Sequence, residues 1–406
     1  MMDTQNEKEE LLADSGAESV PALLVPYPSV ELAGEGQQPT ESELAALLKS
    51  PRLRQLRERY TSLEQAVEIA REFTEWVKKQ PAAGSVLLSA EDGVDYWFAG
   101  DLHASFEVLL RAFALVSSRA RQSNRQACLV LLGDIIDRGT EELACLAMVE
   151  DWLMCGEMDG VRLLCLQGNH DVALQRSMRG GFSSYVIPAE TADILNFMYS
   201  TPGERAASEV LGRAAMELAA TRPVMAEITN LGGGPPEGSI LLVHAGLPHT
   251  DLQGNARRQI AQFRCLTQRP LHESVPADEW DLWTDDMLWN RMRPGLKSLA
   301  PRRGFAGNLM GVDDVNTYRR LHHTLTGRAI CCLVRGHDHI PAGWCLYSYH
   351  PQHNPQLNDA TQHECTMLGI NTMRIAGNPM LQHACPMLAH WQRGAAELLL
   401  HNLIPG

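Results

Sequence analysis

From about residue 86 onward, short apolar runs alternate with longer amphipathic stretches, and this alternation restricts the fold more than any other feature. Val94–Ala99 is a short apolar run, and Ser105–Ala120 follows with apolar residues at helical spacing. Cys128–Leu132 and Glu141–Met158 repeat the same order. Strands that alternate with helices are typical of α/β proteins, so the pattern predicts an α/β core.

Further apolar runs extend the predicted strands toward the end of the chain. They are Val161–Leu166, Val224–Thr229, Ile240–His244, Ile330–Val334, Trp344–Tyr347, Thr366–Ile370 and Met387–Trp391. Residues 188–222 have helical spacing instead, which indicates a helical insertion between core strands.

The first 85 residues have a different pattern and are predicted to form an N-terminal extension. Residues 1–42 contain a Gly-, Gln- and Glu-rich segment without periodicity, so we expect them to be disordered. Residues 41–80 are predicted to be helical, and a Pro-Ala-Ala-Gly sequence ends this stretch. The remaining residues, 86–406, then form the main domain.

The charge of the chain disfavours two classes of partner. Lys and Arg number 35 and Asp and Glu number 49, so the net charge is 35 − 49 = −14. We expect no nucleic-acid partner and no membrane partner, because both present negative surfaces. The acidic start lacks the pattern of a secretory signal, and the ten cysteines include no Cys-x-x-Cys pair. These features predict a cytoplasmic protein, and they leave its oligomeric state open.

Side chains that can bind metals follow five of the predicted strands. The five blocks are Gly100-Asp101-Leu102-His103, Gly133-Asp134-Ile135-Ile136-Asp137-Arg138-Gly139, Gly168-Asn169-His170-Asp171, His244-Ala245-Gly246-Leu247 and Arg335-Gly336-His337-Asp338-His339. In open α/β sheets, ligands bind at the carboxyl ends of the strands. Two carboxylates, three imidazoles and one carboxamide form a mixed oxygen and nitrogen set that suits Mn, Fe or Zn. These side chains are Asp101, Asp134, His103, His244, His337 and Asn169. A carboxylate such as Asp134 can bridge two ions.

These five blocks resemble the calcineurin-like metallophosphoesterases and, more narrowly, the phosphoprotein phosphatase family of serine/threonine phosphatases in a bacterial-like form. The family pattern is GDxHG, GDxxDRG, GNHE or GNHD, HxGL and RxH, and it recurs here in order from residue 100 to 337. The resemblance implies a central β-sandwich flanked by helices, with metals at the strand ends. It makes residues 86–406 the catalytic domain and does not cover the first 85 residues.

The resemblance also implies a role for each matching residue. Asp101, His103 and Asp134 hold the first of two metal ions. The residues around the second ion are Asp134, Asn169, His244 and His337. A hydroxide between the ions attacks phosphorus, and His170 protonates the leaving group while Asp137 orients His170. Arg138 and Arg303 bind the phosphate oxygens of the substrate. Arg303 is assigned this role because it precedes Gly304 in the Arg-Arg-Gly sequence that follows Leu288-Trp289.

Some positions depart from the family pattern. Ala104 stands where Gly is usual, and Asp171 replaces Glu, as in bacterial members and in diadenosine tetraphosphate hydrolases. The eukaryotic SAPNY block is missing from the matching strand, residues 366–372. His339 matches a metal-binding histidine of the broader metallophosphoesterases, whereas Arg335 favours the narrower family, in which that histidine is not a ligand. Both interpretations of His339 stay open.

Three functions are compatible with this sequence. The leading prediction is a two-metal phosphoric-monoester hydrolase that acts as a serine/threonine protein phosphatase on phosphorylated proteins. The alternative is hydrolysis of dinucleoside polyphosphates or another small phosphoester. The third is a non-catalytic scaffold, which the complete set of six ligands and the acid His170 disfavours.

Overall fold

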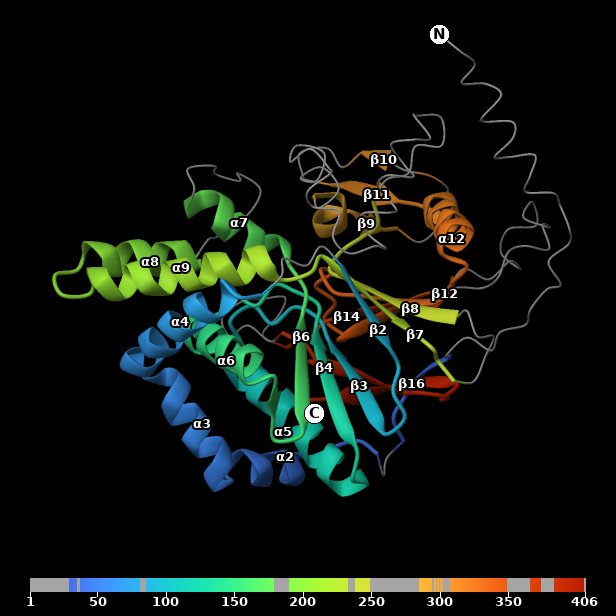
Figure 1. Ribbon diagram of the computed structural model, residues 1–406. Helices are drawn as coiled ribbons and strands as arrows, with labels where there is room; N and C mark the ends of the chain where they lie inside the picture. Colours follow the sequence, from blue (N-terminus) through green and yellow to red (C-terminus); the bar gives the residue numbers. More distant parts are fainter. Residues whose placement is uncertain are drawn as a thin grey trace, which may run out of the picture.

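A computed structural model of the chain describes all five sequence blocks and the elements around them. The described residues are 29–34, 37–80, 85–178, 190–232, 238–248, 285–293, 296, 298, 300–301, 307–348, 366–373 and 383–404. Two large β-sheets lie at the centre, with helices on both sides (Figure 1). Among the described residues, no helix combines the length and the apolar character needed to cross a bilayer.

The first large sheet has seven strands. Their order across the sheet is β1 (Ser29–Leu32), β16 (Glu397–Asn402), β15 (Met387–Gln392), β3 (Val94–Ala99), β4 (Gln126–Leu131), β6 (Val161–Cys165) and β5 (Glu157–Met158). Strands β3, β4 and β6 are parallel neighbours, so the blocks that follow them leave from the same edge.

The second large sheet has six strands. Their order is β13 (Trp344–Ser348), β14 (Thr366–Ile370), β12 (Ala329–Arg335), β8 (Gly238–Val243), β7 (Met225–Thr229) and β2 (Ser85–Ser89). Strands β8 and β12 are parallel neighbours. A small third sheet contains β10 (Ala300–Pro301), β11 (Asn308–Met310) and β9 (Arg291–Met292).

One hydrophobic core lies between the two large sheets, because each sheet directs alternate side chains toward the other. In β4, Cys128 and Val130 pack in this core, together with Leu242 of β8 and Val334 of β12. Leu129, which lies between these two residues in β4, points the other way and packs against helices. Apolar burial on both faces explains why β4 is an almost continuous apolar run.

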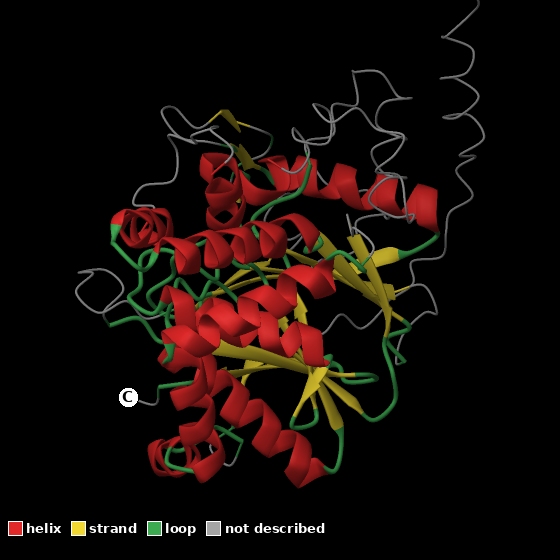
Figure 2. Ribbon diagram, turned by 60° about the vertical axis from the view of Figure 1, so that its left-hand side comes forward, coloured by secondary structure: helices red, strands yellow, loops and turns green. Residues whose placement is uncertain are grey.

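Helices cover the outer faces of both sheets (Figure 2). The helices over the seven-stranded sheet are α2 (Glu41–Leu48), α3 (Pro51–Thr61), α4 (Leu63–Val77), α5 (Phe106–Ser123), α6 (Glu142–Cys155), α8 (Glu190–Ser200) and α9 (Arg205–Thr221). Helix α12 (Val312–Thr326) packs on the six-stranded sheet through Val315 and Tyr318. The predicted sandwich flanked by helices is confirmed.

The N-terminal helices form where the sequence predicts them. The side chains of Thr40, Ser50 and Ser62 each cap the helix that follows. The expectation of disorder over residues 1–42 is wrong for Ser29–Leu32, which forms β1 and pairs with β16. An edge strand supplies hydrogen-bond partners that a local sequence pattern does not reveal. The division of the chain at residue 85 stays a prediction.

Candidate active site

The predicted metal-binding side chains leave the carboxyl ends of β3, β4, β8 and β12 and the start of α7 (Asn169–Met178). The turns that carry them are unusual, because several non-glycine residues have left-handed backbone angles. His103 has φ 45°, Asp134 has φ 50° and His337 has φ 64°. This conformation is costly for such residues and concentrates at functional sites.

Asp101, His103 and Asp134 lie together and are almost completely buried. Nδ1 of His103 lies 3.0 Å from the carbonyl oxygen of Ile136, which turns Nε2 toward the two carboxylates. That Nε2 is 3.8 Å from Oδ2 of Asp101 and 3.7 Å from Oδ2 of Asp134. The three side chains therefore converge on one point from two neighbouring strands.

Asn169, His244 and His337 form the other half of the cluster around Asp134. Oδ1 of Asn169 is 2.8 Å from Nε2 of His244 and 3.0 Å from Nδ1 of His337. Nε2 of His244 is 3.4 Å from Oδ2 of Asp134. His244 is fixed through Nδ1, which is 2.8 Å from the carbonyl oxygen of Leu132. All six predicted ligands thus come together, with Asp134 in contact with both halves.

The donor set fits metal ions. The cluster contains three groups of residues, and within each group the candidate ligand atoms lie within 4.8 Å of one another. Asp134 belongs to two of these groups. Oδ2 of Asp101 and Nε2 of His337 are buried without a hydrogen-bond partner among the described residues. Such atoms are costly unless something else binds them. A cation bound to each of these atoms would remove this cost.

The electrostatics of Asp101 and His103 point the same way, whereas the carboxylates of Asp134 and Asp101 outweigh burial at His244 and raise its pKa to about 9. Burial raises the pKa of Asp101 to about 6, and the neighbouring carboxylate of Asp134 adds to this effect while His244 opposes it. Burial also holds the pKa of His103 well below its usual value, helped by His170. A neutral imidazole beside two crowded carboxylates is the form in which these groups bind metals.

His170 and Asp137 form a buried pair next to the cluster. Nδ1 of His170 is 2.8 Å from Oδ2 of Asp137, and the other carboxylate oxygen accepts from the backbone N–H of Thr191. The backbone N–H of His170 donates to Oδ1 of Asp134. Nε2 of His170 is buried and has no hydrogen-bond partner within the described part of the chain. The pair therefore leaves one imidazole nitrogen free for a proton transfer.

Arg138 lies at the mouth of the cluster. Its Nη1 is 3.2 Å from Nε2 of His103 and 2.6 Å from Nε2 of His339. Nε2 of His339 is in turn 3.7 Å from Oδ2 of Asp101, and Asp101, His103 and His339 form one of the three candidate metal groups. The predicted Arg303 lies outside the described residues.

A buried ion pair that the sequence does not predict holds the turns of the site. Oδ2 of Asp171 accepts from the backbone N–H groups of Asp134 and Gly168, and Oδ1 accepts from Ile135. Nη2 of Arg222 lies 3.0 Å from this carboxylate, and both side chains are 3% exposed. Asp171 carries a signal in the Gly-Asn-His-Asp block. For Arg222, an arginine before a strand gives no such signal.

A model of the family described as calcineurin-like phosphoesterase matches residues 95–341. This range holds all five blocks and covers more than half of the chain, so the chain belongs to the calcineurin-like phosphoesterase family. Members of this family depend on metals, which agrees with the donor set described above.

Two curated proteins and one solved structure are similar to parts of this chain. Shewanella-like protein phosphatase 2 of Arabidopsis thaliana is 36% identical over 76 residues, which is 18% of this chain and 19% of that protein. Serine/threonine-protein phosphatase 1 of Salmonella typhimurium is 31% identical over 85 residues, 21% of this chain and 33% of that protein. The chain thus spans a fifth to a third of the length of these relatives.

The solved structure is a protein serine/threonine phosphatase from Saccharomyces cerevisiae. It superimposes with a TM-score of 0.51 at 12% identity and covers 90% of this chain and 97% of its own. At this identity the likeness concerns the fold alone, and it supports the sandwich architecture.

Proposed function

We propose that this protein is a two-metal phosphoric-monoester hydrolase that removes phosphate from phosphoserine or phosphothreonine in proteins. The observation that carries the proposal is the buried His170–Asp137 pair beside the six side chains that are candidate metal ligands. A non-catalytic scaffold would not require a general acid such as His170, and a metal site without catalysis would not require the His170–Asp137 pair. Together they match phosphoester hydrolysis.

In this proposal, Asp101, His103 and Asp134 hold one ion of Mn, Fe or Zn. The second ion is held by Asp134, Asn169, His244 and His337. When bound, such a pair of ions supplies Lewis acidity that activates water and balances the charge of the phosphate. The close placement of Asp134 to both halves suits a bridging carboxylate.

The side chains of the chain itself bind and protonate the substrate. The guanidinium of Arg138 presents a planar set of donors to the phosphate oxygens, and Arg303 is proposed as its counterpart. Asp137 accepts from Nδ1 of His170, which fixes the orientation of the ring and leaves Nε2 without a hydrogen-bond partner among the described residues. His170 then gives the Nε2 proton to the leaving oxygen of a serine or threonine side chain.

The test compares leaving groups that differ in their need for a proton. We expect His170→Asn to lower kcat on a phosphoserine peptide by about 10²- to 10⁴-fold, as is typical for loss of a general acid. The loss on p-nitrophenyl phosphate should be much smaller, because that leaving group departs without protonation. His323→Asn, at an exposed histidine, is the matched control. Equal losses on both substrates would contradict the role of His170.

Hydrolysis of dinucleoside polyphosphates is the second candidate, and the observation in its favour is Asp171 in the third block. Turnover of diadenosine tetraphosphate and of a phosphoserine peptide by the same metal-loaded protein distinguishes the two. Activity on the nucleotide alone would reject the protein-phosphatase proposal. Bound metal with no activity on any phosphoester would favour the scaffold.

A further inference from the structure

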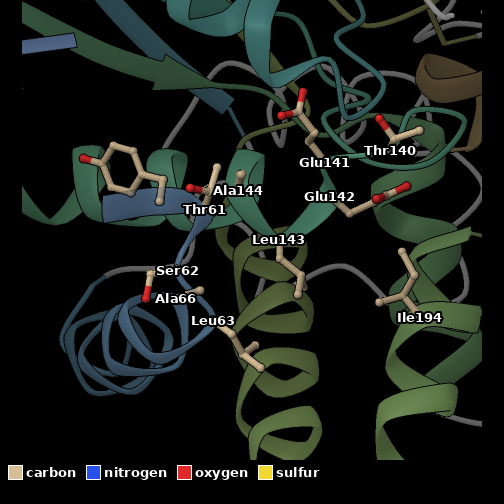
Figure 3. A pocket seen from close by; sticks show the side chains of 11 residues that line it. Thr61, Ser62, Leu63, Ala66, Thr140, Glu141, Glu142, Leu143, Ala144 and Ile194 are labelled. Atoms are coloured by element: carbon tan, nitrogen blue, oxygen red, sulfur yellow. The ribbon is translucent and has the colours of Figure 1, made fainter. Parts of the chain in front are cut away.

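A pocket of about 350 Å³ lies outside the candidate metal cluster, where the α3–α4 connection meets the start of α6 and α8. It joins the N-terminal helices to the helical insertion. In Figure 3, Thr140, Glu141 and Glu142 lie in the upper part of the lining, and Leu63, Leu143 and Ile194 lie below them. The residues that matter here are Thr140, Glu141 and Glu142 on the polar side and Leu63, Leu143 and Ile194 on the apolar side.

The polar side contains a buried carboxylate, Glu142, that has one oxygen without a partner among the described residues. Glu142 is 2% exposed, and its Oε1 has no hydrogen-bond partner among the described residues. Burying an ionised carboxylate without a counter-charge is expensive, so such groups are normally paired. Glu141 adds a second carboxylate, and no Lys, Arg or His stands among the described lining residues. The described lining therefore carries two carboxyl groups and no cationic side chain.

The apolar side determines what kind of cation fits. Leu63, Leu143 and Ile194 offer surface to a hydrocarbon stem, which a hydrated metal ion does not have. Primary amines on aliphatic chains combine a compact positive charge with such a stem. We propose that this pocket binds a primary ammonium group on a short aliphatic stem, with the carboxylate of Glu142 as its ion-pair partner.

The pocket is close to the catalytic block in the chain. Arg138 and Glu142 are four residues apart, so their Cα atoms are separated by at most about 14 Å. Burial raises the pKa of Glu142 to about 7, and the negative charges of Asp137 and Glu190 add to this effect. The backbone N–H of Arg138 donates to Glu190. A cation beside Glu142 thus acts on the same acidic groups that hold Arg138 and His170.

Two sources can supply this ligand chemistry. One is a lysine side chain of a phosphorylated polypeptide, a source that rests on the function proposed above. The other is a free aliphatic amine. The pocket itself depends on neither source, so its binding chemistry can be tested separately from catalysis.

The first experiment measures binding of n-butylammonium by titration calorimetry, with n-butanol as the neutral analogue. We expect saturable binding of the ammonium ion alone and a Kd at least about tenfold higher for Glu142→Gln. Glu150→Gln is the matched control, because Glu150 is also 2% exposed on α6 but does not line the pocket. Ile194→Phe narrows the apolar side, keeps Glu142 and should also weaken binding.

Binding that is absent in the wild type, equal for n-butanol, or unchanged in Glu142→Gln would overturn the proposal. If Glu142→Gln fails to fold, Ile194→Phe provides the test. Binding of n-butylammonium to Ile194→Phe with the affinity of the wild type would then overturn the proposal.

The second experiment identifies the source with phosphoserine peptides that carry lysine or norleucine at each of the four positions on either side of the phosphoserine. A higher kcat/KM for a lysine peptide, lost in Glu142→Gln and kept in Glu150→Gln, supports the pocket and assigns it to the substrate. Equal turnover of both peptides, with n-butylammonium still bound, supports the pocket as a site for a free amine. Amine binding without hydrolysis of any peptide refutes the proposed protein-phosphatase activity and leaves the pocket supported.

Discussion

The buried pair of Asp171 and Arg222 should contribute more to the stability of this protein than any surface ion pair. We consider the variant Asp171→Asn, which keeps the shape of the side chain but removes its charge. The carboxylate accepts three backbone N–H bonds and lies 3.0 Å from a guanidinium that is 3% exposed. The substitution leaves Arg222 buried without its counter-charge. Loss of one partner from such a pair costs about 3–5 kcal/mol in the free energy of unfolding.

The assay is equilibrium unfolding in urea at pH 7, read by circular dichroism. Glu209→Gln is the control, because Glu209 pairs with Arg205 on a surface where the side chains are 54% and 64% exposed. We expect that control to lose less than about 0.5 kcal/mol, as is typical for exposed helical pairs. The double variant Asp171→Asn/Arg222→Met removes both buried charges and should recover part of the loss.

A loss below about 1 kcal/mol for Asp171→Asn would refute this reasoning, since it would mean that Arg222 is hydrated or finds another partner. A double variant that is less stable than Asp171→Asn would also contradict it. The second outcome would show that the remaining bonds of Arg222 matter more than its charge. Those bonds run to the carbonyl oxygens of Leu166 and Leu218.

Three other outcomes can be measured directly. Burial alone would raise the pKa of Glu227, but His322 and Arg328 outweigh it and lower that pKa to about 2. The ionised Glu227 therefore stabilises the fold by roughly 3 kcal/mol above pH 4.5, and this stabilisation is lost as the pH falls toward 2. In urea unfolding, the free energy of unfolding of Glu227→Gln should fall less steeply between pH 4.5 and pH 2 than that of the wild type. Removal of metal by a chelator should abolish phosphatase activity and lower Tm, and added Mn²⁺ should restore both; an unchanged Tm would contradict a metal site in this cluster. Leu129→Ala, which removes a fully buried side chain of β4, should cost about 2–5 kcal/mol in urea unfolding, and a loss under 1 kcal/mol would place that residue outside the core.

The site residues could be predicted because each block carries its own signal. A glycine, a ligand-type residue and a preceding apolar run occur within about ten positions, so a local pattern identifies Asp134 or His337 before any contact is known. The ends of parallel strands then bring the blocks together. In the structure, Asn169 contacts both His244 and His337, residues far away in the chain.

Other features could not be predicted because they depend on contacts between distant segments. Strand β1 exists through its pairing with β16, and Gln38 extends that contact to the carbonyl oxygen of Leu400. Arg222 is positioned by a carboxylate 51 residues earlier in the chain. The Glu142 pocket forms only where α6 meets the N-terminal helices and α8. None of these contacts leaves a periodic pattern in the sequence.

The strained turns of the site explain why so many of its carboxylates have a second task. Each left-handed residue costs roughly 1–2 kcal/mol, so the turns need compensating bonds. The backbone N–H groups of three such residues donate to buried or half-buried carboxylates: Asp134 to Asp171, Arg138 to Glu190, and His337 to Asp101.

Asp101 therefore has two tasks in the proposed metal centre. Its Oδ2 atom would serve as a ligand, and its Oδ1 atom fixes the turn that carries His337. Asp101→Asn keeps an oxygen at the ligand position, but it can place an NH₂ group against the backbone N–H of His337. It should therefore weaken both halves of the metal cluster, although Asp101 is proposed as a ligand of only one ion.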